Sequence, residues 1–68
     1  MKGGFANARI EKLIRDAGAR RVSADAIDKL NQVLTDHGTA IAKYAVGLAR
    51  HSGRKTIKEG DIKLAAEK

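Results

Sequence analysis

The 68-residue sequence contains no cysteine, no proline and no tryptophan, and it has one phenylalanine and one tyrosine. Without cysteine no disulfide can form, and no cluster of cysteine and histidine offers a structural zinc site. No apolar run approaches the ~18 residues of a membrane span, and Met1 to Gly4 do not lead into a signal-peptide core. A chain of this size buries only about 60% of its unfolded surface. We therefore expect a second chain to supply the missing buried area.

Positive charge is what the sequence has in excess. Fourteen lysines and arginines face eight acids, which gives a net charge of +6 and a pI near 10.1. Such a balance points to a polyanionic partner, and the lack of a long apolar run favours nucleic acid over a membrane surface. An acidic protein partner stays open. No nucleophile–base pairing and no phosphate-binding glycine motif is present, so we expect no enzyme activity, cofactor, metal site or small-molecule substrate.

Apolar residues recur with helical spacing in three segments. The pattern predicts a single all-α domain over residues 1–68, with helices at about residues 6–17, 24–51 and 59–67. Gly18 follows the first helix and can close it in the left-handed conformation. Ser23 precedes the second helix and offers its hydroxyl as an N-cap.

The predicted central helix is too long for its own domain. Its 28 residues would span ~42 Å, whereas a compact chain of this length has a radius of gyration of only ~11 Å. The middle of this helix would stay exposed unless a second copy crossed it. Gly38 lies at the midpoint, either as a tolerated glycine costing ~1 kcal/mol relative to alanine or as the point of close approach. The residues expected in such a dimer core are Leu30, Leu34, Gly38, Ile41 and Ala45.

Two loops between the predicted helices carry cations without acids. The first contains Arg20 and Arg21, and the second contains Arg54, Lys55 and Lys58. Several cations on a short loop, beside the hydroxyl of a threonine, suit a row of phosphates better than a solvated surface. Both loops are therefore predicted to contact the backbone of a nucleic acid.

The helix layout and two loop motifs resemble the archaeal histones over about residues 10–66. The motifs are Asp-Ala-Gly-Ala-Arg-Arg-Val-Ser at residues 16–23 and Ala-Arg-His-Ser-Gly-Arg-Lys-Thr-Ile-Lys at residues 49–58. The resemblance implies a histone fold that forms an intertwined head-to-tail dimer, in which the long helices cross. It also implies that the first loop of one protomer lies beside the second loop of the other, and that DNA bends around the outside.

The resemblance assigns roles to individual residues. Arg21 matches an arginine that enters the DNA minor groove, and Thr56 matches the threonine that helps to hold it. Lys12 stands where the family usually has arginine, so it keeps the charge but loses the fork geometry. Arg54 and Asp61 match an ion pair that braces the second loop. The residues expected at DNA are Lys12, Arg15, Arg20, Arg21, Arg54, Lys55, Thr56 and Lys58.

Further positions match those through which family dimers assemble. Leu48, His51 and Asp61 correspond to the junction between dimers, although His51 and Asp61 are also explained as residues favoured by helix dipoles. A second set corresponds to contacts between successive turns of a superhelix. This stacking set is Asp16, Gly18 and Arg50.

The sequence thus predicts an architectural protein that binds double-stranded DNA largely without sequence specificity, bending and wrapping it around dimers that assemble into tetramers or longer arrays. Expected partners are duplex DNA, further copies of the chain and paralogous histones, and the expected location is the chromosome in the cytoplasm. One alternative is a histone-fold component of a heterodimeric transcription factor, which need not keep cations in both loops. Another is a small helical dimer that binds RNA or acts as a repressor; duplex RNA would not suit groove insertion by an arginine.

Overall fold

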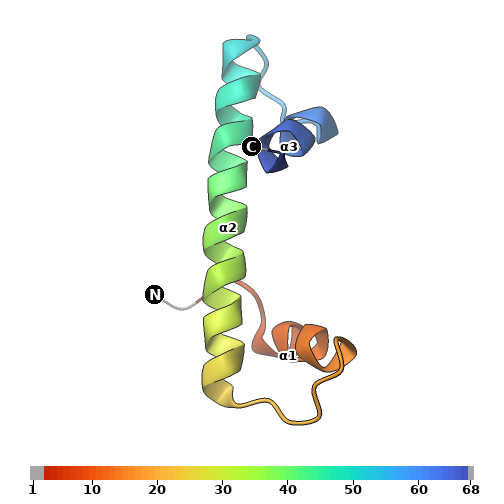
Figure 1. Cartoon of the computed structure of the whole chain (residues 1–68). Coiled ribbons are helices and arrows are strands. Elements are labelled where there is room, and N and C mark those ends of the chain that lie inside the picture. The colour runs from red at the N-terminus through yellow and green to blue at the C-terminus, as the bar shows by residue number, and fades with distance from the viewer. Residues whose placement is uncertain (1–2, 68) are drawn as a thin grey trace. The chain divides into compact units, whose positions relative to one another are not determined.

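The structure is a computed structural model that describes residues 3–67. In that range it contains three helices, α1 (Asn7–Asp16), α2 (Ala24–His51) and α3 (Glu59–Ala66) (Figure 1). The predicted all-α order of short, long and short helix is confirmed. Two helices are slightly shorter than predicted, because the terminal residues Ala6, Ala17 and Glu67 are capping residues outside them.

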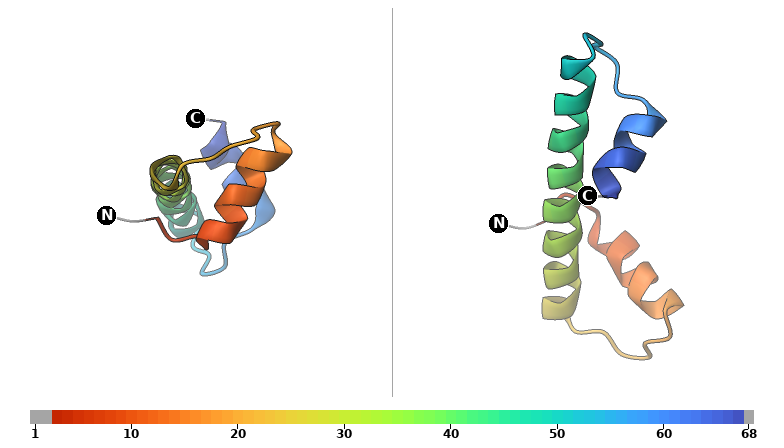
Figure 2. Two further views of the ribbon diagram at one scale, coloured as in Figure 1. Left: turned by 90° about the horizontal axis from the view of Figure 1, so that it is seen from below. Right: turned by 45° about the horizontal axis from the view of Figure 1, so that its top comes forward.

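The helices form two compact units that divide between Asp36 and His37. In the first unit α1 lies beside the N-terminal half of α2, and in the second α3 lies beside the C-terminal half (Figures 1 and 2). Within the described residues, no helix combines the length and the apolar character that crossing a membrane requires.

Glycines end both of the helices that precede a basic loop. Gly18 has a φ of +117° and Gly53 a φ of +74°, both in the region that disfavours residues with a Cβ. Each donates its N–H to the carbonyl three residues earlier at 2.9 Å, and the next residue donates to the carbonyl five residues earlier. This is the Schellman arrangement. At the start of α2, the Ser23 hydroxyl accepts the N–H of Ala26 at 3.1 Å, so the predicted N-cap is also confirmed.

A short N-terminal strap, residues 3–6, is hydrogen bonded to α2 in the first unit. The side-chain amide of Asn31 accepts the N–H of Phe5 at 3.0 Å and donates to the carbonyl of Phe5 at 2.7 Å. It also donates to the side chain of Asn7 and accepts the hydroxyl of Thr35, both at 3.3 Å. Thr35 in turn accepts the N–H of Gly4 at 2.7 Å. Asn31 is 2% exposed, and all its donors and acceptors are used.

The apolar core of the single chain is small. The fully buried apolar residues among those described are Ile10, Ala45, Ala49 and Ala65. Several large apolar side chains are instead at least 39% exposed: Phe5, Leu13, Val33, Tyr44, Ile57, Ile62 and Leu64. A core made mostly of alanine removes little apolar surface from water. The folded single chain therefore leaves much of its apolar surface uncovered.

Candidate nucleic-acid interface

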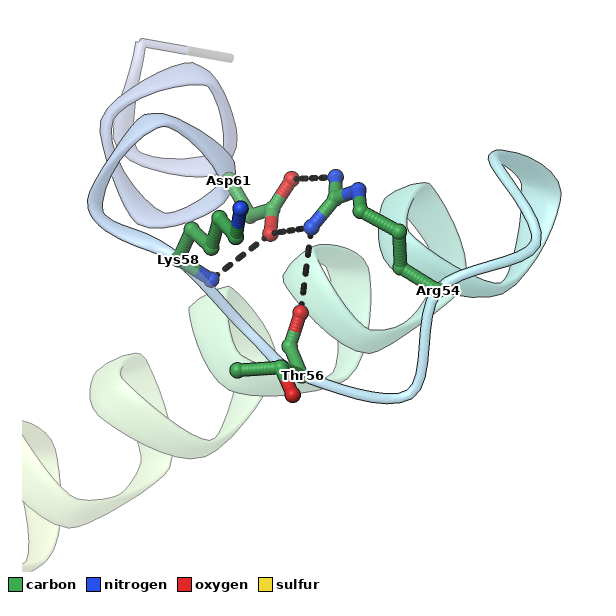
Figure 3. Close-up of polar contacts among 4 residues, drawn as sticks. All are labelled: Arg54, Thr56, Lys58 and Asp61. Atoms are coloured by element: carbon green, nitrogen blue, oxygen red, sulfur yellow. Dashed lines mark hydrogen bonds and ion pairs between the residues drawn. The ribbon is translucent and has the colours of Figure 1, made fainter.

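A network centred on Arg54 holds the second basic loop in place. Its guanidinium donates two hydrogen bonds to the Asp61 carboxylate, from Nη2 to Oδ1 at 2.7 Å and from Nη1 to Oδ2 at 2.9 Å. Nη1 also donates to the carbonyl of Thr56 at 3.0 Å, and the backbone N–H of Lys58 donates to Asp61 Oδ2 at 2.8 Å (Figure 3). The network ties the loop to the first turn of α3.

The hydrogen bonds of the network keep Asp61 ionised. The pairing with Arg54, followed by the N–H of Lys58, lowers the pKa of Asp61 to about 2. The carboxylate therefore stays negative well below neutral pH, down to about pH 2, and keeps the arginine oriented. Only 7% of the Asp61 side chain is exposed, so this acid presents little negative surface to a polyanion.

The remaining polar side chains of this loop are exposed. Lys55, Thr56 and Lys58 all face solvent. Within the described residues, the ammonium groups of Lys55 and Lys58 make no ion pair, and the hydroxyl of Thr56 makes no hydrogen bond. The network thus uses Arg54 for bracing and leaves two cations and one hydroxyl available to phosphate groups.

The first basic loop is held by Arg15 at the end of α1. The Arg15 guanidinium pairs with Glu11 through Nε and Nη2, both at 2.9 Å, and its Nη1 donates to the carbonyl of Arg20 at 2.9 Å. The side chains of Arg20 and Arg21 are exposed and, in the part of the chain that is described, make no ion pair. Arg21 therefore stands at a loop whose main chain is anchored one residue earlier.

The two α1 cations that we expected at DNA both have acidic neighbours. Arg15 pairs with Glu11 as described, and Lys12 pairs with Asp16 at 3.0 Å. These exposed pairs at i and i+4 contribute only about 0.3–0.5 kcal/mol each. Glu11 is not among the residues predicted for the site, but its spacing of four residues from Arg15 is the helical pairing distance and indicates this contact.

The expected assembly residues differ in their exposure and in their contacts. Leu48 is half-buried and His51 is exposed at the end of α2. Asp61 belongs to the second-loop network, where it already accepts three hydrogen bonds. Of the stacking set, Asp16 is engaged by Lys12 and Arg50 is exposed. Across residues 3–67, no three histidine or acidic side chains gather into a group that would hold a metal ion.

Comparison with known proteins agrees with this geometry. Residues 4–66 match the family described as histone-like transcription factor (CBF/NF-Y) and archaeal histone. The chain is 47% identical over 60 residues to one of the chains of the archaeal histone HAN1 from Thermococcus zilligii, covering 88% of this chain and 90% of that protein. It is 39% identical over 54 residues to the probable archaeal histone 3 of Methanocaldococcus jannaschii, covering 79% and 81% respectively. The chain therefore belongs to the family of histone-like transcription factors and archaeal histones, as an architectural DNA-binding protein of chromatin and not an enzyme.

Proposed function

We propose that the chain forms an intertwined homodimer that holds duplex DNA by its backbone and wraps it with little regard to sequence. The observation that carries this proposal is that hydrogen bonds hold both basic loops in place, while the remaining cations of these loops are exposed and make no ion pair within the described residues. An interface that reads phosphates needs cations held in fixed places, and base-specific contacts are not required. The proposed location is the chromosome in the cytoplasm, with paralogous histones as further partners.

The exposed apolar surface supports the dimer. Besides the uncovered side chains, the second unit has an open depression of about 290 Å³ between α2 and α3, lined by His37, Ala40, Ile41, Tyr44, Ala65 and Ala66. Apart from its two neighbours and the nearby backbone of α2, no atom of residues 3–67 lies within 4 Å of a methyl group placed at Gly38. We therefore assign the dimer core to the predicted residues Leu30, Leu34, Gly38 and Ile41, covered by the α2 of a second copy. The fifth predicted residue, Ala45, is already 0% exposed within its own chain, so it belongs to the core of the protomer.

A second depression supports the pairing of unlike loops. It has a volume of about 310 Å³ and is lined by Val46, Ala49, Arg50, Arg54, Lys55 and Ile57. In the proposed dimer the first loop of the other protomer lies against this depression. Arg21 of one protomer and Thr56 of the other would then share one site for the minor groove. Lys12, Arg20, Lys55 and Lys58 would bind the neighbouring phosphates.

We further propose that dimers join on DNA through Leu48, His51 and Asp61, and that Asp16, Gly18 and Arg50 lie where successive turns approach. Asp61 is nearly buried and has one lone-pair position left on Oδ1 after its three hydrogen bonds. A histidine from another dimer would have to reach that oxygen. The junction therefore depends on the second-loop network being intact.

Binding to a labelled duplex over a range of salt concentrations tests the DNA proposal. The logarithm of the binding constant should fall linearly with the logarithm of salt, by about 0.9 for each neutralised phosphate. Arg21→Ala should weaken binding and flatten this slope. The matched control is Lys43→Ala, which removes an exposed cation from α2 outside the proposed interface. An affinity that does not depend on salt would exclude the proposal.

Nuclease digestion of reconstituted complexes tests the assembly. Protected fragments that grow by one dimer footprint at a time would support continuous wrapping. His51→Ala should leave dimers intact and shorten the protected fragments. Fragments of one size for both proteins would exclude the array while leaving dimeric DNA binding in place.

A further inference from the structure

Arg15 occupies a junction between α1 and the first basic loop. Two of its five N–H donors make hydrogen bonds, Nε to the Glu11 carboxylate and Nη1 to the carbonyl of Arg20, both at 2.9 Å. Nη2 lies 2.9 Å from the same oxygen of Glu11 and adds an ion pair. The guanidinium is therefore fixed on one side by an acid of its own helix and on the other by the loop main chain. Its charge is partly neutralised where a phosphate would have to approach.

The second loop contains the same arrangement. Arg54 is paired with Asp61 and donates through Nη1 to the carbonyl of Thr56 at 3.0 Å (Figure 3). In each loop an acidic side chain holds an arginine. That arginine donates a hydrogen bond to a main-chain carbonyl at, or directly before, the residue expected to contact the DNA groove. The carbonyl belongs to Thr56 itself in the second loop, and to the residue directly before Arg21 in the first.

We propose that Arg15 is a positioning residue for Arg21 and not a phosphate-binding cation, with Glu11 as the acid that orients it. This inference rests on the proposed binding of duplex DNA. Fixing the carbonyl of Arg20 restricts the peptide that leads into Arg21, so less conformational entropy is lost when that side chain enters a groove. A planar guanidinium can bridge an acid and a carbonyl at fixed angles, whereas a lysine ammonium cannot hold both in that geometry.

The same helix offers a matched control. Lys12 and Asp16 form an ion pair of the same spacing at 3.0 Å, with side chains 70% and 62% exposed. Lys12 makes no hydrogen bond to a loop carbonyl among the described residues. The two acids thus carry the same charge on the same helix, but only Glu11 orients a loop contact.

Neutralising each acid in turn separates the two roles. Glu11→Gln and Asp16→Asn each remove one negative charge near DNA, and charge alone should strengthen binding in both. If Arg15 positions the loop, Asp16→Asn strengthens binding, but Glu11→Gln weakens it by about threefold, because a neutral amide holds the guanidinium less strongly than a carboxylate does. If Arg15 binds phosphate, Glu11→Gln frees it and affinity rises in both variants. That rise would overturn the inference.

Two further variants make the test specific. Arg15→Lys keeps the charge and loses the fork, so it should bind more weakly than the original protein, and Arg15→Ala, which also removes a positive charge, should bind more weakly still. Binding of Arg15→Lys equal to the original protein would overturn the inference. In a protein that already carries Arg21→Ala, Glu11→Gln should no longer weaken binding, because its effect acts through Arg21. An equal loss with and without Arg21 would also contradict positioning.

Amide hydrogen exchange of the free protein gives a reading that does not involve DNA. Residues 20–22 should exchange several-fold faster in Glu11→Gln than in Asp16→Asn, with α2 unchanged in both. Equal exchange in the two variants would refute the brace. If the unaltered protein does not bind DNA in a salt-dependent way, the proposed function is refuted. The amide exchange rates would then still show whether Arg15 holds the first loop.

Discussion

Replacement of Asn31 by alanine tests how much the N-terminal strap contributes to the free energy of unfolding. The two shorter hydrogen bonds, to the main chain of Phe5 at 2.7 and 3.0 Å, should each contribute about 1 kcal/mol. The two at 3.3 Å together add about 0.5 kcal/mol. Phe5 is 50% exposed, so water can reach its freed peptide groups and no full desolvation penalty arises. Alanine recovers about 0.6 kcal/mol of helix propensity. The expected net loss is about 2 kcal/mol per protomer.

Denaturant unfolding at one fixed protein concentration measures this loss, because the stability of an associating protein depends on its concentration. Asn7→Ala is the control, since it removes only one of the 3.3 Å bonds and should cost about 0.5 kcal/mol or less. In Asn31→Ala the amide of Phe5 should also lose its protection from hydrogen exchange. If Asn31→Ala unfolds within about 0.5 kcal/mol of the unaltered protein, the strap bonds are replaced by water without cost and the reasoning fails.

Three further predictions concern helix ends and the second-loop network. Ser23→Ala should lower the free energy of unfolding by about 1 kcal/mol and Ser23→Asp should restore it, because either oxygen can cap α2; equal stability of both variants would contradict the cap. Gly53→Ala should cost about 1–2 kcal/mol because its φ is +74°, whereas Gly47→Ala inside α2 should gain about 0.5–1 kcal/mol; denaturant midpoints shifting in the same direction would argue against this. The Asp61 pKa of about 2 lies below the unfolded value of ~3.9, so its contribution is complete above about pH 4 and is lost as the pH falls towards 2. Asp61→Asn should be less stable than the original protein at neutral pH, and its free energy of unfolding should fall less as the pH is lowered. Denaturant unfolding at several pH values measures both effects.

The features that the sequence predicted well are those with local causes. Gly18, Ser23 and the helical spacing of apolar residues act over a few positions of the chain, so the helix ends were placed to within one residue. The ion pair of Arg54 with Asp61 crosses a loop, and only the likeness to the histones suggested it. For Arg21 and His51 the proposed partners lie on other molecules, so the likeness to the histones, and no contact within the chain, assigns their roles.

The strap was not predicted because its cause is not local. Asn31 lies 26 residues from Phe5 in the sequence, and a single polar residue in an amphipathic helix normally faces solvent. No short motif indicates that a side-chain amide will pair with a distant peptide group. The contact of Arg15 with the carbonyl of Arg20 is not predicted either. The sequence pattern assigned Arg15 to phosphate, and no motif indicates that its side chain reaches the main chain of the loop.

The alanine-rich core has a consequence for how much of the protein is folded in the cell. Ala45, Ala49 and Ala65 bury little surface, so in the proposed dimer folding and association would form one equilibrium, and the concentration of the chain would control the fraction that is folded. Each tenfold fall in concentration weakens that equilibrium by about 1.4 kcal/mol. Newly made chains would remain open to proteolysis until they meet a partner, whereas duplex DNA, by binding only the paired form, would protect them. The length of DNA available would thereby set the amount of protein that persists.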